Sequence, residues 1–233
     1  MALIQGSALK PIEREPLWDL AHTQLREALL AGRFEPGATL TLRFLAENFG
    51  TSITPVRDAV TRLVAQGVLQ QGPRNSAIVP HLTASELKHL TVVRCALEGR
   101  AVREAVTQGD RKALQRLETR LATMRALIAD RHLDSYLDHH RQFHFELYAM
   151  SRIPLLVEMI ENMWLRCGPA LSFVIPQYVL SRKGSDHHTA ALKAISAGNQ
   201  DIAEAEIVAD ITEAAHYLEG LADSDGRLRS PGK

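Results

Sequence analysis

This sequence of 233 residues has few aromatic residues, few cysteines and no formal net charge. Only 5% of its residues are aromatic while 45% are hydrophobic, a balance that suits an aliphatic helical core better than an aromatic-rich sheet. Two cysteines, Cys95 and Cys167, are too few for a disulfide framework, so we expect a protein of the reducing cytoplasm. A net charge of zero does not exclude nucleic-acid binding, because only the binding face must be basic.

Long apolar runs are also missing. No stretch approaches the roughly 18 consecutive apolar residues of a membrane-spanning helix, and the first ten residues do not resemble a secretory signal. We therefore expect no membrane partner. The two ends of the chain, residues 1–16 and 223–233, are rich in polar residues, glycine and proline, and we expect them to be irregular or disordered.

Hydrophobic periodicity predicts short elements in the first third of the chain. Ser52 and Thr54 are both candidate N-caps for a helix with Pro55 at or near its first position. Residues 72–76 combine glycine, proline and asparagine, which is typical of a hairpin tip. The expected elements are helices over residues 17–31 and 40–48, a helix ending at Gln66, and β-like runs over 68–71 and 77–79.

After Pro80 the pattern becomes helical throughout. Thr83 and Glu86 have the spacing of a capping box, in which each side chain satisfies a backbone donor of the other residue. The fold class expected is therefore mainly α: a helix-turn-helix with a small β-hairpin over residues 10–80, and an all-α bundle over 83–222. The expected bundle helices are 84–108, 111–130, 133–150, 154–174, 178–197 and 200–222.

The segment from Leu40 to Leu63 reads as two helices joined by a tight turn at Gly50. The small Ala46 allows the helices to cross closely, and the second helix turns an apolar stripe inward. Its outward residues near the N-terminus would then enter a DNA major groove, where an arginine can bind a guanine edge or a phosphate. Candidate DNA contacts are Arg43 on the first helix, Ser52, Thr54, Arg57 and Thr61 on the second, and Arg74 and Asn75 at the hairpin tip.

Charge does not separate this interpretation from a plain helical subdomain, since residues 1–80 hold eight basic and seven acidic residues. The ordered turn chemistry is more specific. The run from Leu45 to Leu69 resembles the winged helix of the GntR family of transcriptional regulators. It departs from the family pattern at Ile53, where an arginine is frequent, and at Asn75-Ser76, where the wing usually has a glycine. The resemblance implies a regulator, a repressor or an activator, that binds double-stranded DNA.

The second region resembles the FCD effector-binding domain found in the FadR-like branch of this family. The run Arg94–Val102 looks like the opening helix of that domain, and Gln142-Phe143-His144 and the segment from His188 to Ile195 also match. Many such domains hold a divalent metal through one aspartate and three histidines. In this chain the aspartate and one histidine are exchanged between the first and fourth positions. The ligand set that the resemblance implies is His140, His144, His188 and Asp210, which suits Zn²⁺, Ni²⁺ or Mn²⁺.

The same resemblance implies a small-molecule effector, and a carboxylate is the chemistry that a metal and an arginine would hold together. Arg94 occupies the arginine position of the opening helix and is the first candidate for that contact; Arg100, Arg141 and Arg166 are weaker ones. We expect a homodimer that reads a palindromic operator, with affinity controlled by the effector.

Several alternatives remain open at this stage. The neighbouring histidines His139 and His187 allow the match to the family ligands to slip by one position. Asp138 could be the carboxylate instead, although it lies six residues before His144 and points to another face. Histidines four residues apart also often lie on a polar helix surface. The metal could be purely structural. The four residues could also serve a metal-dependent hydrolase, although Glu146 lies off the face of His144 and no nucleophile motif is present.

Overall fold

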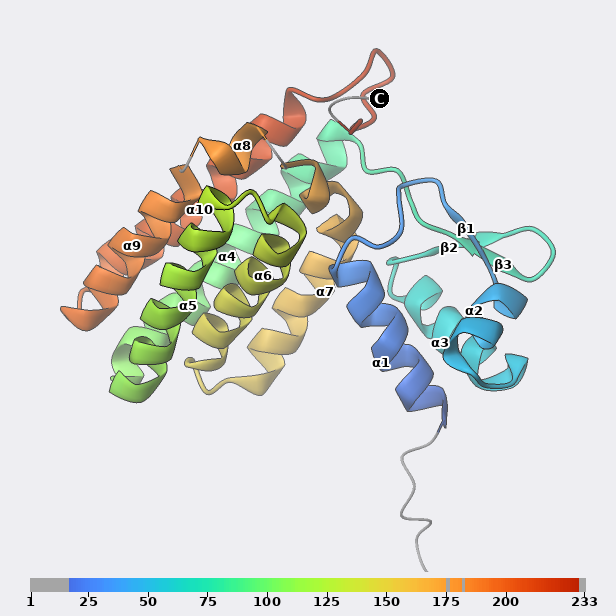
Figure 1. Ribbon diagram of the computed structural model, residues 1–233, viewed down its shortest axis with the longest axis horizontal. Helices are drawn as coiled ribbons and strands as arrows, with labels where there is room; N and C mark the ends of the chain where they lie inside the picture. The colour runs from blue at the N-terminus through green and yellow to red at the C-terminus, as the bar shows by residue number, and fades with distance from the viewer. Residues whose placement is uncertain (1–16, 175–176, 182, 231–233) are drawn as a thin grey trace, which may run out of the picture.

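The computed structural model describes residues 17–174, 177–181 and 183–230, and it places a winged helix beside a larger helical bundle (Figure 1). The winged helix lies at the right of this view, and α1 runs along its border with the bundle. The mainly helical class expected from the sequence is confirmed. The elements of the winged helix are α1 (Leu17–Leu30), β1 (Thr39–Thr41), α2 (Leu42–Phe49), α3 (Ile53–Ala65), β2 (Gln70–Gly72) and β3 (Ser76–Ile78).

The small sheet contains a strand that the sequence did not indicate. Its order is β1-β3-β2, and both neighbours pair with β3 in antiparallel register. The helix expected from Leu40 therefore begins two residues later, at Leu42, because Leu40 and Thr41 belong to β1. Thr41 then caps α2 by accepting a hydrogen bond from the backbone N–H of Phe44 at 3.1 Å. Three residues are too few for strand periodicity to be visible in a sequence.

The next helix also begins differently from the prediction. Ser52 is the N-cap of α3, so Thr54 is not the cap and Pro55 is the third helical residue. Proline is tolerated there because the first-turn N–H groups of a helix have no intrahelical acceptor. Val56 and Val60 are buried on the inner face, as their spacing predicts.

The bundle follows the predicted helices closely, with one break. Two helices, Gln177–Leu180 and Lys183–Ser196, replace the one expected over 178–197. The helix expected over 154–174 ends at Leu171 and is followed by a 3₁₀ turn. The predicted capping box is confirmed, since Thr83 and Glu86 exchange both hydrogen bonds. The bundle elements are α4 (Ala84–Gln108), α5 (Arg111–Ala129), α6 (Leu133–Ala149), α7 (Pro154–Leu171), the 3₁₀ turn Ser172–Val174, α8 (Gln177–Leu180), α9 (Lys183–Ser196) and α10 (Gln200–Glu219).

The segment after α10 is not the disordered tail that its composition predicts. Asp223 accepts backbone hydrogen bonds from Asp225 and Arg227, at 3.0 and 2.9 Å, and so closes a turn. The turn returns Leu228 to the bundle, where it packs with Leu87 and is only 2% exposed. One buried leucine thus orders a polar segment through the hydrophobic effect. The remaining residues predicted to be irregular, 1–16 and 231–233, lie outside the described residues.

The winged helix and the bundle are packed together through α1 and α7. Leu165 of α7 belongs to the buried core of the winged helix, and Leu30 of α1 packs against the cores of both parts. Arg26 and Glu161 form an ion pair across the same contact. Gly168 allows the close approach, because a Cβ at that position would lie 3.0 Å from the carbonyl oxygen of Leu29.

Candidate functional site

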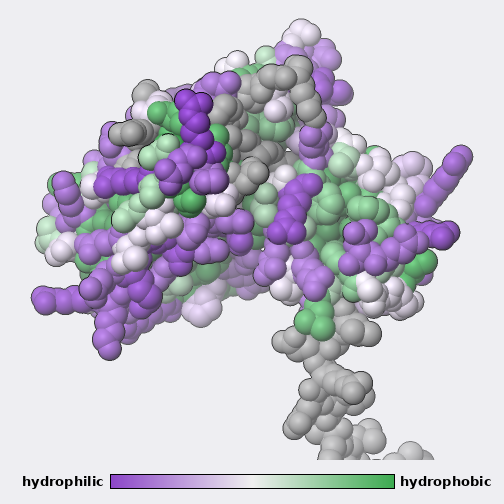
Figure 2. Space-filling model, viewed as in Figure 1, coloured by the Kyte–Doolittle hydropathy of each residue, from purple (hydrophilic) through white to green (hydrophobic). Residues whose placement is uncertain are grey.

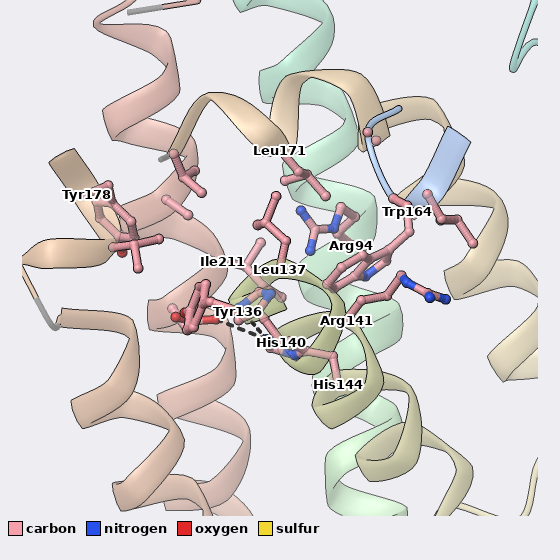
Figure 3. Close-up of a pocket in the computed structure, with 18 residues that line it drawn as sticks. Arg94, Tyr136, Leu137, His140, Arg141, His144, Trp164, Leu171, Tyr178 and Ile211 are labelled. Atoms are coloured by element: carbon pink, nitrogen blue, oxygen red, sulfur yellow. Dashed lines mark hydrogen bonds and ion pairs between the residues drawn. The ribbon is translucent and has the colours of Figure 1, made fainter. Parts of the chain in front are cut away.

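The four residues of the implied ligand set come from three helices and meet inside the bundle. His140 and His144 lie one turn apart on α6, His188 is on α9 and Asp210 is on α10. One ligand atom from each lies within 4.8 Å of the others. His144, His188 and Asp210 are buried, and His140 is partly buried (Figure 3). The neighbours that could have shifted the alignment lie apart from this group: Asp138 is half exposed, and His187 bonds Glu206 at 2.7 Å.

The distances within this cluster have the size that a bound cation requires. The Nε2 atom of His144 lies 3.1 Å from Nε2 of His140 and 3.1 Å from Nε2 of His188. The Oδ2 atom of Asp210 lies 3.4 Å from Nε2 of His188 and 3.6 Å from Nε2 of His144. Ligand atoms about 2.0–2.1 Å from a common metal lie roughly 3.0–3.4 Å from one another. The cluster therefore fits a divalent ion with small adjustments.

A chain of buried hydrogen bonds fixes which nitrogen of His144 faces the cluster. Its Nδ1 atom lies 2.8 Å from the hydroxyl oxygen of Tyr148, and that hydroxyl donates its proton to Glu98. The hydroxyl oxygen is thus an acceptor for His144, so Nδ1 carries the proton and Nε2 keeps its lone pair. Glu98 in turn accepts from Nε of Arg94 at 2.6 Å. This arrangement prepares His144 as a metal ligand.

The protonation states favour a cation as well. Burial lowers the pKa of His140 to about 3, with a further contribution from His188, and burial lowers the pKa of His144 well below its usual value. Burial alone would raise the pKa of Asp210, but its interactions with His188 and His140 outweigh that effect and lower it. At neutral pH His140 and His144 therefore offer imidazole lone pairs and Asp210 an ionised carboxylate, the forms that bind metals.

A largely apolar cavity of about 70 Å³ adjoins the cluster. Figure 3 shows Tyr136 beside the two histidines of α6, and Arg94 and Trp164 against the same space. The hydroxyl of Tyr178 is buried in the cavity wall without a hydrogen-bond partner among the described residues. A further part of the wall comes from residues 30–32, at the end of α1 in the winged helix. The cavity is therefore shared between the two parts of the protein.

The structure shows a second role for Arg94, the candidate effector contact. It lines the cavity and its guanidinium lies 5.0 Å from the ring centre of Trp164, yet its charge is compensated by Glu98. Burial acts to lower the pKa of Arg94, but Glu98 outweighs it and raises the value. Among the weaker candidates, Arg141 also lines the cavity, whereas Arg100 pairs with Glu104 on the surface and Arg166 is exposed outside it.

Sequence reasoning did not find the aromatic and acidic partners of this site. Glu98 lies four residues after Arg94, and Tyr148 lies four residues after His144, so helical spacing was the available signal. For Tyr178 the sequence offered no signal, because its position depends on the break between α8 and α9.

The candidate DNA contacts are all on the surface of the winged helix. Thr54, Arg57 and Thr61 are exposed along α3, and Ser52 precedes them without a side-chain capping bond. Arg43 on α2 is exposed and pairs with Glu47 at 2.8 Å. At the hairpin tip Arg74 and Asn75 have positive φ angles of 51° and 59°, which turn the chain sharply. Ser76 replaces the glycine of the usual wing and is buried, with its hydroxyl donating to the carbonyl of Pro73 at 2.6 Å.

Two family profiles match this chain. Residues 20–79 match the bacterial regulatory proteins of the gntR family, and residues 89–213 match the FCD domain. The chain belongs to the GntR family of transcriptional regulators. Members of this family bind DNA and respond to small molecules through the FCD domain, and some FCD domains bind metals.

Individual relatives agree with this assignment. The chain is 34% identical over 150 residues to the HTH-type transcriptional regulator McbR of Escherichia coli K12, covering 64% of this chain and 68% of McbR. It is 28% identical over 142 residues to the uncharacterized regulator YdhC of Bacillus subtilis, covering 60% of this chain and 63% of YdhC. The solved structure of E. coli McbR/YncC superposes with a TM-score of 0.81 at 27% identity, covering 88% of this chain and 97% of that one.

The family also decides between the alternative functions. Its members are transcription regulators and not enzymes, so the hydrolase alternative is not supported. Within the described ranges, none of the helices has the length and apolar character needed to cross a lipid bilayer.

Proposed function

We propose that this GntR regulator is a homodimer that holds a divalent metal in its FCD domain and changes its operator affinity when a small carboxylate binds beside that metal. The observation that carries the proposal is the convergence of three imidazoles and one carboxylate on a cavity whose wall includes residues 30–32 of the winged helix. His140, His144, His188 and Asp210 would hold the metal, which would supply a positive charge to a carboxylate ligand.

The shared wall supports direct control of the DNA-binding part. A ligand in the cavity contacts the end of α1, and α1 is fixed against α7 at Gly168 and through Leu165. Any ligand that prefers one position of α1 therefore biases the position of the whole winged helix, which is what coupling between two sites requires. Gly168→Ala would force the two helices apart, so we expect it to change the response of operator affinity to ligand.

The size and lining of the cavity support a small carboxylate. A cavity of about 70 Å³ is small beside those that hold drug-sized molecules, so the ligand has few heavy atoms. Among the described residues the Tyr178 hydroxyl in the wall has no hydrogen-bond partner, and Arg94 offers further donors while Glu98 balances its charge. Tyr178→Phe removes only the hydroxyl, and we expect it to weaken ligand binding without loss of metal.

For the contact with a second copy of the chain, the support comes from exposed apolar side chains on α4 and α7, which pack side by side. On α4, Val92 is 71% exposed and Val93 is also exposed; on α7, Leu155 is 67% exposed and Met159 is also exposed. By contrast, the face over α5, α6 and α9 that Figure 2 shows is mostly hydrophilic. Large apolar side chains exposed on neighbouring helices are typical of an association surface.

The decisive experiment measures metal content and operator affinity in the same set of proteins. We expect roughly one metal ion per chain, and its loss in His144→Ala and Asp210→Ala. His216→Ala is the matched control, because His216 is exposed near the end of α10. Unchanged metal content in both ligand variants would contradict the ligand set.

The effector part is tested by a thermal-shift screen of small carboxylates, followed by operator binding with and without each hit. A hit raises the melting temperature of the wild type and changes operator affinity, and both effects shrink in Tyr178→Phe. If chelation lowers the melting temperature but leaves DNA binding and its ligand response unchanged, the metal is structural only.

A further inference from the structure

Ile53, the first residue of α3, is a large apolar side chain that stays exposed. It is 43% exposed, whereas the apolar residues on the inner face of the same helix are buried. The core of the winged helix is thus complete without it. Phe44, another exposed apolar residue of this region, lines a cleft between α2 and the bundle, but Ile53 lies on the helix that carries the candidate base contacts.

The position of Ile53 places it among those candidates. It lies one helical turn before Arg57, so both side chains share one face of α3. Ser52 and Thr54 flank it, both are exposed, and the Ser52 side chain makes no capping bond to the helix. In a helix-turn-helix the first residues of the second helix approach the base edges of the major groove. Ile53 therefore lies at a position that faces a base edge, and its side chain has no group that can form a hydrogen bond.

We propose that Ile53 is a specificity determinant that packs against the C5-methyl group of a thymine in each operator half-site. This inference rests on the DNA-binding role of the family and is independent of the metal and the effector. The thymine methyl is the apolar group that the major groove presents, so it is the natural partner of an aliphatic side chain. Opposite a cytosine or a guanine, Ile53 would cover a polar base edge without satisfying it, which costs free energy.

The test uses the full-length protein and an operator selected from random DNA. Each thymine of that operator is replaced in turn by deoxyuridine, which keeps the base pairing and removes only the methyl group. We expect one symmetric pair of thymines at which the replacement weakens wild-type binding about fourfold per methyl group. Ile53→Ala should bind the thymine and uracil operators equally well.

Ile202→Ala is the matched control, because Ile202 is 50% exposed but lies on α10 of the bundle. It should keep the full sensitivity to the methyl group. Ile53→Arg should select guanine instead of thymine at the same position, since arginine reads the guanine edge.

The proposal is overturned if no thymine is sensitive in the wild type, or if Ile53→Ala, folded by circular dichroism, stays as sensitive as the wild type. A wild-type protein that selects no sequence from random DNA would contradict the DNA-binding role itself, which separates the two failures.

Discussion

The winged helix has its candidate functional side chains on the surface, whereas the bundle has them in its interior. Arg57 and its neighbours project from α3 into solvent, and the inner face of the same helix is apolar at Val56 and Val60. In the bundle, His144 and Glu98 are almost completely buried. A surface site can change its residues without loss of stability, but a buried polar site must satisfy every group it contains.

The difference explains why the bundle contains buried polar groups beyond the four candidate metal ligands. Arg94, Glu98 and Tyr148 form a hydrogen-bonded chain that ends at His144. In this chain the buried charges of Arg94 and Glu98 compensate each other, and each buried polar side chain has a hydrogen-bond partner. The winged helix has no need of such a chain for its candidate DNA contacts. Substitutions of these polar residues should therefore lower stability when they are in the bundle, and lower DNA affinity when they are in the winged helix.

The largest effect is expected from Glu98→Gln, which leaves the buried Arg94 guanidinium without its counter-charge. Removing one partner of a buried ion pair typically costs about 3–5 kcal/mol. The measurement is the free energy of unfolding in urea. Glu104→Gln on the same helix is the control, because its partner Arg100 is 64% exposed and the pair is worth about 1 kcal/mol or less. Equal losses in the two variants would contradict the role of burial.

The next effect is expected from Arg57→Ala, which removes a candidate base contact. We expect operator affinity to fall by about 1–3 kcal/mol, or roughly 5- to 150-fold, with metal content and melting temperature unchanged. Arg111→Ala, an exposed arginine at the start of α5, serves as the control in the same binding titration. A fall in affinity of the same size for both would show that only the overall charge matters.

A smaller effect is expected from acid, through His22 in the core of the winged helix. Burial lowers the pKa of His22 to about 4, helped by the charges of Arg62 and Arg26. The unfolded chain, with an ordinary pKa near 6.5, therefore binds the proton more tightly, and stability is lost as pH falls from about 6.5 towards 4. The loss is roughly 2 kcal/mol by pH 5, and hydrogen exchange of α1 and α3 measures it.

His22→Leu is the partner variant in that experiment, because leucine fills similar space and does not titrate. After division by the intrinsic exchange rates, the protection factors of its winged helix should depend less on pH over the same window, with the bundle unaffected by the substitution. If the two proteins show the same pH dependence in α1 and α3, His22 is not the titrating group.

The smallest effect is expected from Arg43→Ala. Arg43 and Glu47 are both largely exposed, so their ion pair is easily exchanged for a phosphate contact, and folding should not change. We expect operator affinity to fall only a few-fold and the slope of its salt dependence to decrease by about one, measured by titration at several salt concentrations. A sequence-dependent loss would instead indicate that Arg43 reads a base.

Much of the fold was visible in the sequence, because helices carry a local signal. The inner stripe of α3 and the capping box at Thr83 both follow from spacing alone, and both are confirmed. Two predictions failed where that local signal is weak. The strand β1 is too short for a periodic pattern, and Leu228 is a single apolar residue whose burial depends on a turn that brings it back to α4.

For the candidate metal site, the sequence by itself determined the residue types and the pair on α6, where His140 and His144 lie one turn apart by helical geometry. The ligand set as a whole came from resemblance to a family, since no local rule connects His188 to Asp210. Only the tertiary structure decided that α6, α9 and α10 bring the four side chains together, and that the end of α1 closes the same cavity. The physical reason is that periodicity reports which face of a helix is buried, whereas the neighbour it is buried against depends on packing across the whole chain.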